Sequence, residues 1–69
     1  MERNVALEIK RRFHGPENYS LSLLEVMAMT EIFSDAEETT YCIRKDDALY
    51  VATVTESGEV KNTLLHICI

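Results

Sequence analysis

Cysteine, glycine and proline are scarce in this 69-residue chain, which has two, two and one of them. So little glycine and proline, together with 46% hydrophobic residues, argues against disorder, because there is enough apolar surface to offset the entropy of ordering the backbone. No apolar run approaches the length of a membrane span, and Glu8 interrupts the N-terminal apolar residues, unlike in a signal peptide. We therefore expect a folded protein of a reducing, cytoplasmic compartment, without membrane contact.

The chain is also short, and no motif in it identifies a reaction, a cofactor or a nucleic-acid code. A domain of this size buries only roughly 60% of the surface of its unfolded chain, which leaves little room for an enclosed active site. We expect a single small domain over residues 1–69. Because the apolar fraction is large for so small a volume, we also expect an apolar face that a partner protein or a second copy covers.

Four potential zinc ligands are present, but their spacing matches no closed zinc site. His66 and Cys68 stand two apart on one predicted strand, and Cys42 and His14 complete the four donors. For nucleophilic catalysis, a cysteine beside a histidine needs a third group to orient it, and no Asn or Asp is placed to serve. We expect no metal, no cofactor and no enzymatic activity, with a buried cysteine and a half-exposed histidine at a sheet edge.

The formal charge of −5 is unevenly distributed along the chain. Residues 1–15 carry a net +2 and residues 39–69 a net −1, whereas residues 16–38 carry −6 and no basic residue. Compensation of a helix dipole explains the single basic run, Lys10-Arg11-Arg12, better than contact with nucleic acid does. The acidic balance disfavours direct binding to nucleic acid and permits docking on a basic protein surface.

Residues 4–13 fit two periodicities. Apolar side chains alternate from Val5 to Ile9 as in a strand, whereas Val5, Ile9 and Phe13 form a helical stripe. The basic run 10–12 favours the helix, because cations are stabilised at a helix C-terminus, and Gly15-Pro16 would end it. We predict a helix here and keep a strand as the alternative.

The most apolar segment runs from Leu21 to Phe33 and predicts the main helix of the domain. Ser22 and Glu25 have the spacing of a capping box, and Ser20 is a competing cap. Apolar side chains continue around almost the whole predicted helix, so its apolar arc is wider than one sheet face needs. An acidic connector over residues 34–38 follows it.

The last thirty residues predict three strands, at Thr40–Arg44, Ala48–Thr55 and Val60–Ile69. Turns at 45–47 and 56–58 join them into an antiparallel meander. The predicted fold class is therefore α+β, with two helices packed on a three-stranded antiparallel meander in the order α-α-β-β-β. If residues 4–13 were a strand, the order would be β-α-β-β-β.

Alternation within these strands divides the side chains between two faces. The first face, which we expect to be the core, contains Tyr41, Ile43, Leu49, Val51, Leu65 and Ile67. The second face contains Cys42, Tyr50, Val54 and Leu64. Because this second face is too apolar to remain in contact with water, we expect a partner to cover it.

Together these features predict a small acidic protein–protein interaction module, which acts as a regulator, inhibitor or accessory subunit of a larger protein. We expect it to form a homo-oligomer and to bind a protein partner with a basic surface. Carboxylates at the end of the predicted main helix oppose its dipole, which suggests that they serve binding. The predicted partner-binding residues are Glu31, Asp35, Glu37, Glu38, Tyr50, Val54 and Leu64.

The alternative function is an acidic mimic of DNA or an antagonist of a nucleic-acid-binding protein. Six acidic groups over residues 17–38 are sparser than such mimicry requires. Salt separates the two hypotheses, because the affinity of a mimic falls steeply with added salt whereas that of an apolar docking face changes little.

Overall fold

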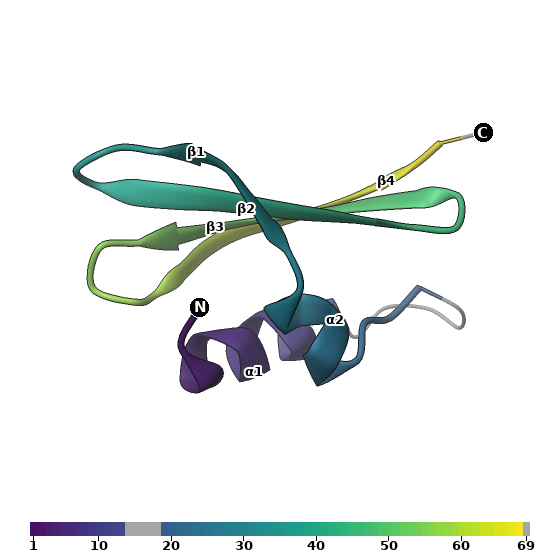
Figure 1. Cartoon of the computed structure of the whole chain (residues 1–69), viewed down its shortest axis with the longest axis horizontal. Coiled ribbons are helices and arrows are strands. Elements are labelled where there is room, and N and C mark those ends of the chain that lie inside the picture. Colours follow the sequence, from purple (N-terminus) through teal and green to yellow (C-terminus); the bar gives the residue numbers. More distant parts are fainter. Residues whose placement is uncertain (14–18, 69) are drawn as a thin grey trace.

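A computed structural model describes residues 1–13 and 19–68 of the chain. Two helices precede a four-stranded antiparallel sheet, in which each strand pairs with the next along the chain (Figure 1). The elements are α1 (Arg3–Arg12), α2 (Leu23–Met27), β1 (Thr30–Ser34), β2 (Glu38–Lys45), β3 (Ala48–Thr55) and β4 (Val60–Ile67). The predicted α+β class is confirmed, and the meander has one strand more than predicted.

Helix α1 confirms the helical interpretation of residues 4–13 over the alternative strand. Val5, Ala6 and Ile9 are buried on one face, as the helical stripe requires. The basic run lies in the last turn, where it faces the negative end of the helix dipole. The Gly15-Pro16 stop signal lies outside the described residues.

The predicted main helix is wrong in length, because α2 ends at Met27 and the following residues form β1. The predicted capping box is confirmed: the Glu25 amide donates to Ser22 Oγ at 3.1 Å, and the Ser22 amide donates to Glu25 Oε1 at 2.8 Å. Beyond the helix, β-branched and aromatic residues fill β1, and pairing with β2 supplies their backbone partners. The wide apolar arc of the predicted helix came from merging these two elements.

The assignment of faces is wrong for one strand, β3. Its buried residues are Ala48, Tyr50, Ala52 and Val54. Tyr50 pairs with Ile43 on β2 and Leu65 on β4, whereas a three-residue turn at 45–47 would have paired Ile43 with Leu49. The β2–β3 loop contains only Asp46 and Asp47, and a shift of one residue turns every side chain of a strand to the other face.

On the β4 side, the chain between the strands runs from Glu56 to Glu59, with Gly58 at a positive φ of 91°. The pairing also shifts by one residue between Thr53 and Val54. The Val54–Val60 pair is the one that the predicted turn at 56–58 gives, so this shift alone reverses the faces of β3 relative to β4 along the rest of both strands. Thus Tyr41, Ile43 and Leu65 keep their predicted face, and only the β3 side chains change sides.

The helices cover one face of the sheet, and the core lies between the two layers (Figure 1). The Phe13 and Tyr50 rings meet edge to face, with centroids 5.2 Å apart. Lys45 Nζ donates to the Ser20 carbonyl oxygen at 3.0 Å and to Glu25 Oε1 at 3.2 Å, which ties the end of β2 to the start of α2. Among the described elements, no helix lies on the other face of the sheet.

Candidate functional site

We call the side of the sheet that points away from the helices the open face. Its residues alternate along each strand with those of the core and follow from the strand register. They are Thr30, Phe33, Thr40, Cys42, Arg44, Leu49, Val51, Thr53, Asn62, Leu64 and His66, with Glu38, Thr55 and Lys61 at one end.

An apolar stripe crosses the middle of the open face. Cys42, Val51 and Leu64 are directly paired across β2, β3 and β4. On β1, Phe33 is paired with Thr40 and lies diagonally from Cys42, within reach of an aromatic side chain. Phe33 is 53% exposed and Leu64 is 56% exposed, whereas Cys42 and Val51 between them are partly buried by their neighbours. Side chains of this size on adjacent, hydrogen-bonded strands form one contiguous apolar surface rather than scattered exposed residues.

The charged groups of the open face lie at its two ends. Arg44 is exposed at the end nearest the β2–β3 loop. At the opposite end, Lys61 Nζ donates to Glu38 Oε2 at 2.7 Å, and this contact raises the pKa of Lys61. With one acidic and two basic groups, the open face carries a formal +1 on a chain of −5.

The remaining acidic residues of the sheet are concentrated in its turns. Asp35 and Glu37 lie in the β1–β2 turn and Glu56 in the β3–β4 turn at the same end, whereas Asp46 and Asp47 lie at the other (Figure 1). The Glu56 amide donates to the Glu37 carbonyl oxygen at 2.8 Å, which joins the two turns. The sequence-based prediction missed Glu56, because its signal was only that of a turn.

Asp35 stabilises the β1–β2 turn, a role that was not predicted from the sequence. Its Oδ1 accepts hydrogen bonds from the amides of Glu37, at 2.8 Å, and Glu38, at 2.9 Å. These two donors hold the pKa of the Asp35 carboxyl below its ordinary value. The acidic residues 35–38 therefore belong to a strand-connecting turn and the start of β2, and the premise that they oppose a helix dipole is wrong.

The structure brings some of the predicted partner-binding residues together and separates others. Asp35, Glu37 and Glu38 are gathered at the β1–β2 turn, whereas Glu31 lies on β1 opposite Tyr41 and is exposed. A hollow of about 360 Å³ beside the turn is lined by Glu37, Thr55, Glu56 and Ser57.

The three apolar residues of the prediction do not share a surface. Tyr50 is 1% exposed and Val54 is 7% exposed, and both belong to the core under the helices. Leu64 alone lies on the open face. The prediction that these three residues share one face is wrong, and the directly paired neighbour of Leu64 on the open face is the partly exposed Val51.

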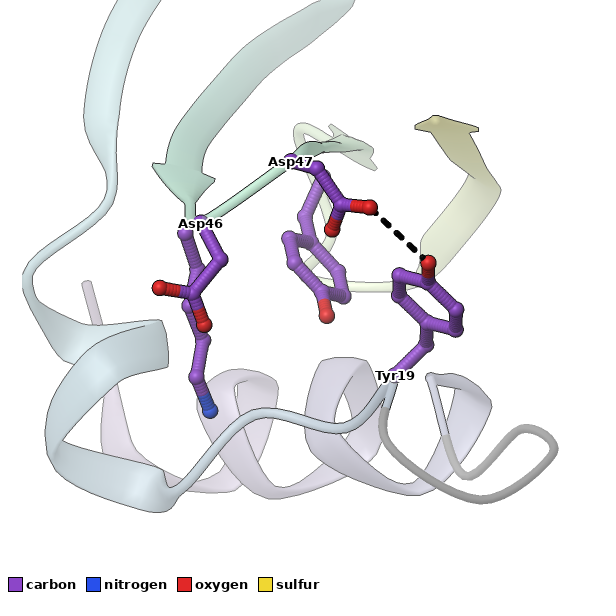
Figure 2. Close-up of a pocket in the computed structure, with 5 residues that line it drawn as sticks. Tyr19, Asp46 and Asp47 are labelled. Atoms are coloured by element: carbon purple, nitrogen blue, oxygen red, sulfur yellow. Dashed lines mark hydrogen bonds between the residues drawn. The ribbon is translucent and has the colours of Figure 1, made fainter. Parts of the chain in front are cut away.

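A small polar cavity of about 220 Å³ lies under the β2–β3 loop, on the helix side of the sheet (Figure 2). The Tyr19 hydroxyl donates to Asp47 Oδ2 at 3.2 Å, and Lys45 on another wall is held by Ser20 and Glu25. Burial and the Asp47 contact raise the pKa of Tyr19. Because the Lys45 ammonium and the Asp47 carboxylate in this lining already bond to the protein, we assign these two contacts to holding the loop against the helix layer.

The potential metal ligands are separated in the fold. Cys42 on β2 and His66 on β4 lie on the open face with β3 between them, and His14 lies outside the described residues. Within residues 1–13 and 19–68, no group of three His, Cys, Asp or Glu side chains is placed to hold a metal ion. Over the same ranges, no helix is long and apolar enough to cross a membrane.

No protein-family model matches this chain, and neither a curated protein nor a solved structure matches it. The open face and the turns that flank it are therefore the features from which we infer a function.

Proposed function

We propose that the protein is a small acidic interaction module that binds another protein surface through the open face of its sheet. Within this proposal it acts as a regulator, inhibitor or accessory subunit of a larger protein in the cytoplasm. The observation that carries the proposal is the apolar stripe of the open face, which consists of Phe33, Cys42, Val51 and Leu64. Fully burying a large apolar side chain is worth about 1.5–3 kcal/mol, so covering the half-exposed members of the stripe contributes several kcal/mol to binding.

The charge distribution specifies the chemistry of the partner. Acidic turns flank the open face at both of its ends, and they include the predicted contacts Asp35 and Glu37. A protein with an apolar patch bordered by basic residues complements this arrangement. Glu38 remains a predicted contact at the rim. Glu31 is paired with Tyr41 and so points to the helix side of β1, and it is removed from the proposed site together with the buried Tyr50 and Val54.

The alternative function, mimicry of DNA by the acidic residues, has weaker support. Glu8, Glu25, Asp35 and Glu38 all accept hydrogen bonds within the protein. These intramolecular contacts give structural reasons for acidic groups that a mimic would direct toward its target. The acidic residues without such contacts lie mostly in short turns, and these turns are at opposite ends of the sheet.

The test starts with an affinity-tagged chain, which captures candidate partners from a lysate of the native host. The recovered partner is then purified, and its affinity is measured by titration calorimetry for the wild type and for Leu64→Glu and Leu24→Glu. Leu24 is a matched control, because it is 80% exposed on α2 in the helix layer. We expect Leu64→Glu to weaken binding by about tenfold or more, because the stripe loses an apolar contact and gains a desolvated charge.

Equal affinities of the two leucine variants would contradict the assignment of the open face. Salt provides a second criterion. An affinity that changes little with added salt supports an apolar docking face, whereas a steep loss with salt favours the mimic.

A further inference from the structure

The open face has a pattern of charge that is complementary to itself. Strand β2 contributes Arg44 near one end of this face and Glu38 near the other. They are six residues apart, on the same side of one strand, which corresponds to roughly 20 Å. A rotation of 180° about an axis that crosses β2 at the level of Tyr41 exchanges their positions.

We propose that a second copy of this chain covers the open face, in a two-fold sheet-on-sheet dimer. In this dimer Arg44 of one protomer faces Glu38 of its partner, and the same contact occurs twice by symmetry. This inference rests on the proposed function, since the second copy covers the same surface and the partner protein has to displace it to bind there.

In a single copy of the chain, the Arg44 side chain is available for this contact. Its neighbour Lys45 points to the helix side, where Glu25 binds it, so Arg44 points to the open side. Among residues 1–13 and 19–68, no carboxylate forms an ion pair with Arg44. Packed sheets lie about 10 Å apart, a gap that extended Arg and Glu side chains bridge together, and Glu38 would then bind Lys61 and the partner's arginine.

The overall charge also favours this face for self-association. Two chains of −5 repel each other wherever their acidic groups meet. The open face carries a formal +1, and the acidic turns lie at the ends of the sheet rather than across its middle. Contact between two open faces therefore buries the stripe while the acidic turns stay at the rim, where they remain available to a basic partner.

The available area sets the expected strength of the dimer. Three strands of eight residues and one of five give a face on the order of 500 Å², since strands advance about 3.4 Å per residue and lie about 4.8 Å apart. Two such faces bury on the order of 1,000 Å², at the lower limit for a specific interface. We therefore expect dissociation in the micromolar range.

The deciding experiment is sedimentation equilibrium of the full chain across micromolar concentrations, with charge-exchange variants. We expect Arg44→Glu to weaken the dimer about tenfold or more, because two symmetric attractive contacts become repulsive. The Arg44→Glu/Glu38→Lys double variant should recover part of the affinity, since the exchanged charges again face each other, although the substitution at Glu38 also removes the ion pair with Lys61. Lys10→Glu on α1 is the control, because it changes the net charge equally on the helix side.

A cross-linking measurement reports the geometry independently. In the proposed dimer the two Cys42 side chains are offset by only two residues along β2, or roughly 7 Å. A short thiol–thiol cross-linker should therefore join two copies of a Cys68→Ser variant, and should fail with Cys42→Ser.

Three results would overturn the dimer: a monomer at every concentration, a double variant as weak as Arg44→Glu, or a dimer that all charge variants leave unchanged. The circular dichroism and thermal transition of each variant establish that it is folded. None of these results decides the proposed function, because that is tested by the effect of Leu64→Glu on a different, purified partner.

Discussion

The two faces of β3 differ in a way that hydrophobicity alone does not explain. The covered face presents Ala48 and Ala52 beside Tyr50, whereas the open face presents the larger Leu49 and Val51. A ranking by apolar content selects the Leu49 and Val51 face as the core. The helices instead cover the face with the alanines, which leave room for the buried side chains of the helix layer to pack at native density. Close packing, together with loop length, decides which face is covered.

Substitutions at two adjacent residues of β3 test which of its two faces is buried. Ala52 is 0% exposed under the helices, whereas Val51 lies partly exposed on the open face. We expect Ala52→Asp to abolish the cooperative thermal transition, because burying an unpaired carboxylate costs several kcal/mol, on the order of the stability of so small a domain. Val51→Asp should retain a transition at a moderately lower temperature, since aspartate is unfavourable in strands by about 1 kcal/mol.

Differential scanning calorimetry of both variants checks this expectation. If Val51→Asp were unfolded and Ala52→Asp folded, the two faces would have to be exchanged. If both were unfolded in dilute monomer, the open face would contribute to the fold as strongly as the core.

Helices and strands that depend on neighbouring residues were predicted well from the sequence, whereas the pairing between strands was predicted less well. The helix at 4–13, the capping box at Ser22 and the bounds of the strand Ala48–Thr55 all follow from residues close together in the chain. Strand β1 was missed, because its apolar residues continue those of α2 without glycine or proline between them. Its strand conformation depends on pairing with β2, a contact that local pattern does not encode.

The candidate site was only partly predictable for a related reason. That an apolar face would remain uncovered followed from composition, and Leu64 was placed on it correctly. To predict which β3 residues lie on that face, the length of the β2–β3 loop must be known to within one residue. A shift of a single residue exchanges the faces of Tyr50 and Val51. The hydrogen bonds of Asp35 could not be predicted from the sequence either, since they depend on the geometry of the turn.

A second prediction compares the two candidate caps of α2. A five-residue helix forms few internal hydrogen bonds, so its N-terminal amides depend on the cap. We expect Ser22→Ala to lower the free energy of unfolding by about 1 kcal/mol. Ser20→Ala should leave it nearly unchanged, because Ser20 contributes its backbone carbonyl oxygen to Lys45. Urea unfolding monitored by circular dichroism measures both values, and equal losses would contradict the cap assignment.

The smallest expected effect concerns the acidic turn and separates structural from functional carboxylates. The pKa of Asp35 is lowered in the folded protein by the amides of Glu37 and Glu38. A carboxyl with a lowered folded pKa stabilises the fold at pH values above its unfolded pKa, and this contribution is lost as the pH falls through the folded value. Asp35→Asn removes the charge but keeps an oxygen acceptor, so it resembles the protonated aspartic acid.

We therefore expect the wild type to be more stable than Asp35→Asn near neutral pH. The difference should shrink below pH 3.8, the ordinary value for this group, as the wild-type carboxyl becomes protonated. Urea unfolding of both proteins over this pH range measures the difference directly, and other titrating groups cancel in it. A difference independent of pH would mean that the charge of Asp35 does not stabilise the turn. In that case its carboxylate would again be available, like that of Glu37, for contact with a basic partner.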